Sequence, residues 1–444
     1  AAMLAYHRAL MTPILHSIDR TLRPNGYIFY GWWLALATAG IHLLSSLLWM
    51  QSYGAYVVLL QAEFGWSKTV VAGAFALTRI ESGLLGPLQG WLTDRFGPRV
   101  ILQIGMVLYG IGFMLFSQVE SVITFYLTFA LMAVGSSLGG FATVMVAVVS
   151  WFQRHRSKAV ALSSLGFSLG GLCVPIVVLA LETWGWRATA FTSGVIILVV
   201  GIPLASLIRH RPQMYGEVPD GSEPAIDSPQ DAARTPMRRD LTPREAFRSS
   251  AFWLISSGHG IALLSVSTMM VHLIPFLTGS AMAFSLAAAG GVVALMTGSQ
   301  VVGQLLGGLL GDQLNKRLIC TGCLVGQGVG IGGVTLATEP WHVMFAVTVF
   351  GLSWGMRGPM MTAIRADYFG SASFGTIMGF SSLIVMFGMT LGPIFSGYLA
   401  DIQGQYDTAF LILAAVSILG ALSFFTARPP VLTPHSRDRS NVAP

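Results

Sequence analysis

Charge is the property that this sequence has least of. Aspartate, glutamate, lysine and arginine together make up 10% of the 444 residues, whereas 54% are hydrophobic. A soluble globular domain carries about 25% charged residues. The composition therefore excludes an ordinary soluble protein and predicts an integral membrane protein.

Alternation of apolar and polar residues is also missing. A membrane-spanning β-strand alternates over about 10 residues, but the apolar runs here are continuous and about 20 residues long, enough to cross ~30 Å of hydrocarbon as helices. We predict an all-α membrane protein with twelve transmembrane helices. They cover about 28–51, 67–90, 99–119, 122–151, 159–182, 188–209, 250–278, 285–310, 317–338, 342–369, 373–399 and 407–427.

Long polar stretches are scarce, and one of them divides the chain. Residues 210–248 are rich in proline, charge and small polar residues, which is typical of a linker. The predicted units are an N-terminal segment 1–27, a six-helix bundle 28–209, the linker 210–248, a second six-helix bundle 249–427 and a tail 428–444.

Cysteines and recognisable catalytic motifs are few or missing. The three cysteines, Cys173, Cys320 and Cys323, fall in predicted helices and give no disulfide framework. The pair Cys320 and Cys323 could bind a metal, but no cluster of histidines or carboxylates accompanies it, so we expect neither metal nor cofactor. There is no P-loop, no H-E-x-x-H and no Ser-His-Asp grouping. We expect no enzyme activity and no ATP drive.

Basic residues are scarce on one predicted face of the membrane. Of the 25 lysines and arginines, Lys68 and Arg187 fall in loops of one face, Arg79 and Arg357 fall within helices, and all the others fall at the opposite face. That face is expected to be cytoplasmic, with both termini inside the inner or plasma membrane. The net charge of +6 is thus a topology signal and does not indicate nucleic acid. Residues 1–26 show no secretory signal pattern. We expect a monomer in the bilayer.

An internal repeat is present at an offset of 218 residues. "GWLTDRFGPR" at 90–99 is matched by "GLLGDQLNKR" at 308–317, and Gly170 is matched by Gly388 at the same offset. Such spacing indicates a parallel duplication of a six-helix unit.

These features resemble a known family. Six plus six helices, a charged middle loop and the motif G-x-x-x-D-R-x-G-x-[RK] resemble the major facilitator superfamily. "YGWWLALATAG" at 30–40 and "WFQRHRSKAVALSSLGFSLGG" at 151–171 are similar to its monocarboxylate transporter and oxalate/formate antiporter branch. The resemblance implies the major facilitator fold and a secondary transporter that moves a small organic anion, a mono- or dicarboxylate, by alternating access. Proton coupling and exchange both stay open.

The resemblance also implies a conformational latch in the repeated loop. Asp94 would face the start of the helix near Ser373, and Asp312 would face the start of the helix near Ser157, where free N–H groups favour an anion. The alternative is a solvated loop whose charges serve topology only. The predicted latch residues are Gly90, Asp94, Arg95, Gly97, Arg99 and Asp312.

Ionisable residues within helices are the candidates for substrate and proton chemistry. Arg79 lies about 18 Å along its predicted helix and Arg357 is similarly deep; an arginine at that depth costs at least about 2.5–3.5 kcal/mol. Each either binds an anionic substrate, since guanidinium matches a carboxylate, or forms an internal ion pair. Glu81 points about 200° away from Arg79. It is predicted to be a proton carrier or the partner of an arginine on another helix.

Two histidines occupy nearly equivalent positions of the repeat. His42 and His259 are predicted substrate or proton-relay residues, with hydrogen-bonded core histidines as the alternative. Further predicted contributors are Tyr53, Tyr56, His272, Ser136, Gln300 and Gln304.

The sequence departs from the resembled anion transporters in two helices. Residues 285–310 contain no ionisable group and residues 373–399 contain no lysine or arginine, which are the places where the resembled anion transporters carry theirs. An anion would therefore depend on Arg79 and Arg357. Trp49, Trp354 and the methionine-rich "MRGPMM" would instead suit an exporter of amphipathic or hydrophobic compounds. A sensor or assembly factor on the same fold is the third alternative.

Overall fold

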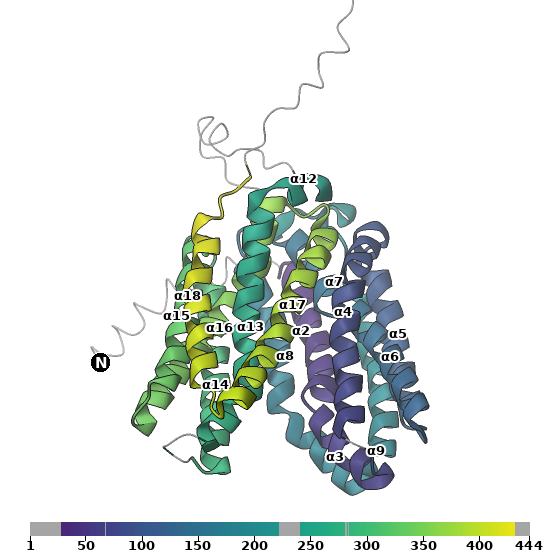
Figure 1. The fold of residues 1–444 in the computed structure, drawn as a ribbon. Coiled ribbons are helices and arrows are strands. Elements are labelled where there is room, and N and C mark those ends of the chain that lie inside the picture. Colours follow the sequence, from purple (N-terminus) through teal and green to yellow (C-terminus); the bar gives the residue numbers. More distant parts are fainter. Residues whose placement is uncertain (1–27, 67, 222–239, 280–281, 283, 431–444) are drawn as a thin grey trace, which may run out of the picture.

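The computed structural model describes residues 28–66, 68–221, 240–279, 282 and 284–430, apart from some side chains within helices. The regular elements of these residues are helices, most of them long and packed side by side (Figure 1). The short helix α12 (Pro243–Arg248), which belongs to the predicted linker, lies at one end of the molecule. We call that end the linker end and the opposite end the far end.

The N-terminal half forms six spans. Its elements are α2 (Tyr30–Ser45), a π-helical turn (Ser46–Met50), α3 (Tyr53–Phe64), α4 (Lys68–Phe96), α5 (Pro98–Phe116), α6 (Val122–Leu138), α7 (Phe141–Trp151), α8 (Arg156–Leu172), α9 (Val174–Ile196), a second π-helical turn (Ile197–Gly201) and α10 (Ile202–Ser206). The 3₁₀ turns Pro212–Tyr215 and Pro219–Gly221 follow.

The C-terminal half is more regular. Its elements after α12 are α13 (Ser250–Gly279), α14 (Leu286–Leu310), α15 (Lys316–Thr335), α16 (Pro340–Phe369), α17 (Phe374–Gln403) and α18 (Asp407–Thr426).

The predicted helix bounds are wrong in three places, and glycine explains one of them. The fourth predicted helix is interrupted at Gly139 and Gly140, between α6 and α7. The second helix, predicted to end at 90, continues as α4 to Phe96, so Asp94 lies in its last turn. The break predicted between the fifth and sixth helices is present as a sharp turn at Gly185, whose φ of 76° is a left-handed conformation that glycine adopts without strain. The first helix continues through α3 to Phe64, beyond the end of its most apolar stretch.

Nine stretches of the described residues are long and apolar enough to cross a membrane. One of them, Arg156–Ser206, contains two spans joined at Gly185. The helices α4 and α16 fall outside this set, and both carry charged residues that lower their mean hydropathy.

The two halves meet through close helix pairs. A Cβ added to Gly90 of α4 would meet the backbone of Gly375 at the start of α17, and one added to Gly86 would meet the backbone of Gly379. Small residues allow this approach. The pairing of α4 with α17 therefore brings the two halves into direct backbone contact near the linker end.

Candidate functional site

Asp94 joins the two halves at the linker end. Its carboxylate accepts hydrogen bonds from the backbone N–H groups of Gly375 (3.0 Å) and Thr376 (2.7 Å) and from the Thr376 hydroxyl (2.7 Å). The first N–H groups of a helix have no partner within the helix, and a carboxylate there is favoured by the helix dipole. The contact therefore caps α17 of one half with a side chain from α4 of the other.

Asp312 makes the repeat-related contact. It lies after α14 and accepts from the backbone N–H groups of Ser157 (2.8 Å) and Lys158 (3.3 Å) at the start of α8. Burial raises the pKa of the Asp312 carboxyl, and the Ser157 and Lys158 donors oppose that shift. These two cross-half contacts are called the latches below, and their role in the transport cycle stays a prediction.

The other predicted latch residues have different surroundings. Gly97 turns the chain with a φ of 85°. Arg95 is exposed and its guanidinium lies 5.3 Å from the ring centre of Trp91. Arg99 is exposed at the start of α5. Gly97 thus shapes this loop. Among the charged residues of the motif, Asp94 is the one whose side chain contacts the other half in the described structure.

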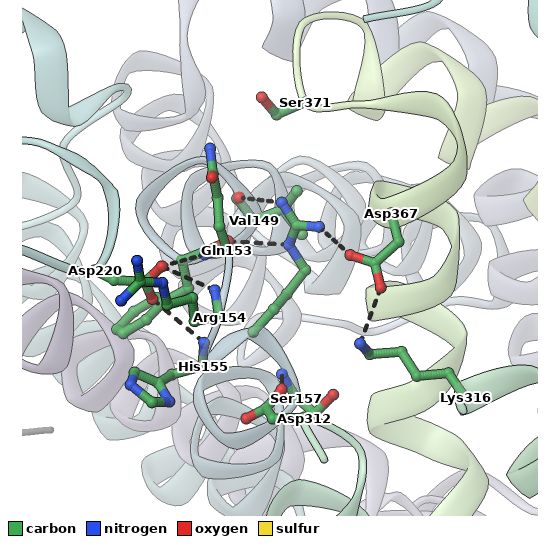
Figure 2. A network of polar contacts seen from close by, with 12 residues as sticks. Val149, Gln153, Arg154, His155, Ser157, Asp220, Asp312, Lys316, Asp367 and Ser371 are labelled. Atoms are coloured by element: carbon green, nitrogen blue, oxygen red, sulfur yellow. Dashed lines mark hydrogen bonds and ion pairs between the residues drawn. The ribbon is translucent and has the colours of Figure 1, made fainter. Parts of the chain in front are cut away.

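An ion-pair network that we did not predict adds a third link. Arg156 donates from Nη1 to Asp367 (2.5 Å), and Lys316 lies 2.9 Å from the other oxygen of Asp367 (Figure 2). Arg156 begins α8 of the N-terminal half, whereas Asp367 and Lys316 belong to α16 and α15. The sequence places all three residues near helix ends, but it gave no signal that they would meet.

Glu81 is hydrogen-bonded to a neighbouring helix. Its Oε2 accepts from the hydroxyl of Ser137 on α6 (2.9 Å) and from that of Ser82 (3.2 Å), and its Oε1 is buried without a hydrogen-bond partner in the described structure. The predicted Ser136 is half-buried next to Ser137. The side chain of Arg79 lies outside the described residues, so the predictions for Arg79 stay open.

The two repeat-related histidines have different partners. His42 Nδ1 donates to the carbonyl oxygen of Ser163 (2.8 Å), and its ring stacks on Phe141 with centroids 5.5 Å apart. His259 Nδ1 accepts from Nη2 of Arg365 (2.9 Å), because a guanidinium can only donate. His42 thus bonds within the N-terminal half, whereas His259 belongs to a cationic cluster.

This cationic cluster lies inside the C-terminal half. Arg357 and Arg365, two turns apart on α16, are each 1% exposed. Arg365 also donates to Ser381 Oγ (2.8 Å). Nε and Nη1 of Arg357 have no hydrogen-bond partner in the described structure, and the thiols of Cys320 and Cys323 lie nearby. Among the described residues, no carboxylate forms an ion pair with either arginine.

Arg365 belongs to the same cluster, although we counted it with the arginines of the predicted cytoplasmic face. It already fell inside the predicted helix 342–369, and in α16 its side chain is buried. The spacing of eight residues from Arg357 places both on one helix face, which is the signal that could have identified it.

The remaining predicted residues are divided between cross-half contact and core. Gln300 donates to Gln304 (3.2 Å), which donates to the carbonyl oxygen of Ala161 on α8 (3.2 Å) and so bridges the halves. His272 Nε2 lies 2.9 Å from the carbonyl oxygen of Pro393. Tyr53, Tyr56 and Trp49 are buried in an aromatic cluster of the N-terminal half. The two tyrosines, predicted as contributors to the site, therefore take part in core packing in this structure.

Comparison with known proteins identifies the architecture. The model described as Major Facilitator Superfamily matches residues 34–298 and 260–443. Monocarboxylate transporter 11 of Mus musculus is 26% identical over 410 residues, covering 89% of this chain and 87% of that protein. The probable sulfoacetate transporter SauU of Cupriavidus necator is 26% identical over 402 residues, covering 86% of this chain and 90% of that protein. The solved structure of the proton:xylose symporter XylE superposes with a TM-score of 0.69 at 14% sequence identity, covering 90% of this chain and 96% of that chain. The predicted fold class is confirmed.

Proposed function

The chain belongs to the Major Facilitator Superfamily, and from that premise we propose that this multi-pass membrane transporter moves a small organic anion, a mono- or dicarboxylate, by alternating access. It works as a secondary transporter in the cytoplasmic membrane, with the linker end and both termini in the cytoplasm. No catalytic step and no cofactor enter this mechanism. The similar proteins named for monocarboxylate and sulfoacetate support an anionic substrate.

The observation that carries the proposal is the cluster of Arg357 and Arg365, which has no ion-pair partner among the described residues. Two cations buried without a counter-ion are costly, and an anion within reach of Arg357 Nε and Nη1 would offset that cost through charge-assisted hydrogen bonds. Because the cluster is buried here, the anion would reach it in another state of the transport cycle. His259 holds Arg365, so we assign it a supporting role.

Proton coupling is assigned to Glu81. Its carboxylate combines two hydroxyl donors with an oxygen that has no hydrogen-bond partner in the described structure, and it lies in α4, the helix that packs against α17 of the other half. A carboxyl in such a place can exchange a proton when the surrounding helices move.

An exporter of hydrophobic compounds is a less favoured alternative. Of the residues that suggested it, Trp49, Met360 and Met361 are buried within cores, whereas Trp354 and Met356 are half-buried. It is less favoured because it gives no role to the two buried arginines. A sensor or assembly factor has no specific support in the described residues.

Uptake into liposomes tests the proposal. Purified protein is reconstituted, and radiolabelled lactate, pyruvate, oxalate, acetate and sulfoacetate are each offered with and without a pH gradient, beside protein-free liposomes. We expect saturable uptake of at least one of these anions above the protein-free control. Transport of a lipophilic dye together with no uptake of any anion would instead favour the exporter.

A further inference from the structure

Two aspartates of the linker bind the loops that precede the latch helices. Asp220 is 7% exposed and accepts hydrogen bonds from the backbone N–H groups of Gln153 (3.0 Å), Arg154 (2.8 Å) and His155 (3.3 Å). Figure 2 shows its carboxylate facing this loop, next to the site where Asp312 meets Ser157. The linker is thus fixed to the N-terminal half just before α8.

Asp240 makes the matching contact in the C-terminal half. It accepts from the backbone N–H groups of Ser371 (3.1 Å) and Ala372 (3.1 Å), and the next residue, Leu241, donates to the carbonyl oxygen of Phe369 (2.9 Å). The offset of 218 residues that relates the two halves converts positions 153 and 154 into 371 and 372. The two ends of the linker therefore bind equivalent loops.

Each of these loops continues directly into a latch. At the start of α8, His155 donates to Asp220 from the linker, while Ser157 and Lys158 donate to Asp312 from the other half. The free N–H groups of one helix start are thus divided between a linker carboxylate and a latch carboxylate.

The same division occurs at the start of α17. Ser371 and Ala372 donate to Asp240, while Gly375 and Thr376 donate to Asp94. A loop that is held in place by one carboxylate presents the next free N–H groups to the second carboxylate in a fixed direction.

We propose that Asp220 and Asp240 are positioning residues that hold the starts of α8 and α17 ready for the two latches. The linker in this way sets how easily the linker end opens, and the inference rests on the proposed alternating access. Fixing the loop in advance lowers the conformational entropy lost when a latch closes. Each aspartate acts on the latch that follows its own loop and leaves the other latch alone.

Asparagine is the suitable replacement at both positions. Asp220 has a φ of 60°, and asparagine is among the few residues that tolerate this left-handed conformation. Asp220→Asn and Asp240→Asn keep shape and one acceptor oxygen but remove the charge. Glu217→Gln is the matched control, because Glu217 is a half-exposed carboxylate of the same linker whose side chain makes no hydrogen bond in the described structure.

Hydrogen–deuterium exchange of the full-length protein tests the coupling without any substrate. Asp220→Asn is expected to speed exchange by about tenfold, the loss of one charge-assisted hydrogen bond, at residues 153–155 and also at Ser157 and Lys158. Exchange at Gly375 and Thr376 stays unchanged. Asp240→Asn gives the mirror result, and Glu217→Gln changes neither region. Faster exchange confined to 153–155, or equal effects on both latches, would overturn the proposal.

Spin-label distances between Val100→Cys and Leu318→Cys, on exposed positions of the two halves, give a second readout in a Cys173→Ser background. Asp220→Asn should raise the population that is open at the linker end when the rest of the chain is wild type. It should not raise that population further in Asp312→Asn, whose latch is already lost, but it should raise it further in Asp94→Asn. Additivity in both backgrounds would contradict the proposal. Neither experiment uses the anion, so a failure here is separate from a failure of the proposed substrate.

Discussion

Charged side chains inside α4 and α16 carry the chemical argument at the scale of single residues. Arg357 and Glu81 could be found from the sequence because a charge within an apolar run is rare. The partners of these two residues could not be found from the sequence. Whether Arg357 lies near a carboxylate or near two thiols depends on how α15 and α16 are rotated about their axes. For the same reason His42 and His259, alike in the repeat, bond to a carbonyl group and to an arginine respectively.

Glu81 gives the prediction at this scale. Glu81→Gln keeps an acceptor for the Ser137 hydroxyl but cannot gain or lose a proton. We expect uptake driven by a pH gradient to fall by about tenfold or more, while exchange of anion against anion continues. Both rates are measured in the same liposomes.

Ser137→Ala is the control for packing. It removes one hydrogen bond to Glu81, which is worth about 1 kcal/mol, and leaves the carboxyl able to titrate. A loss of exchange in Glu81→Gln as large as the loss of gradient-driven uptake would show that Glu81 has a structural role instead.

Whole helices were predictable where their apolar residues formed continuous runs. The C-terminal spans α13 to α18 begin and end within a few residues of the predicted bounds. The break at Gly139 and Gly140 was not predictable from hydropathy, because these glycines act through backbone conformation and leave the apolar run intact. The turn at Gly185, in contrast, lies in the gap predicted between residues 182 and 188.

Close helix contact gives the prediction for elements. Gly90→Ala places a Cβ against the backbone of Gly375, where neither helix can yield without separating. We expect the free energy of unfolding in detergent to fall by about 1–3 kcal/mol, measured as a lower melting temperature. Gly358→Ala introduces the same methyl group within a helix, but nothing lies within 4 Å of its Cβ. It should be neutral or stabilising by up to about 1 kcal/mol. Equal melting temperatures for the two variants would refute the role given to this contact.

The contacts that charged side chains make from one half to the other gather, among the described residues, at the linker end. Asp94 and Asp312 cap helices across the interface, and Arg156 reaches Asp367 beside them. The repeat predicted that the first two contacts would be related, since a duplicated loop must meet a duplicated helix start. The ion pair could not be predicted, because Arg156 and Asp367 are not repeat equivalents.

At the scale of the whole molecule, the buried arginines of the C-terminal half have no ion-pair partner among the described residues. Contacts at the linker end are paired, whereas Arg357 keeps Nε and Nη1 without a hydrogen-bond partner in the described structure. The account therefore assigns substrate charge to this half and conformational control to the linker end.

Equilibrium binding of an anion to the purified protein tests this central claim most directly. Binding of a radiolabelled carboxylate taken from the uptake panel is compared in wild type, Arg357→Gln and Arg428→Gln, the last an exposed arginine at the linker end. The account predicts that Arg357→Gln weakens binding by more than about tenfold, the loss of a charge-assisted contact. Arg428→Gln binds as wild type does, and the uncharged amide of the same compound does not compete. Unchanged affinity in Arg357→Gln, or equal competition by the amide, would contradict it.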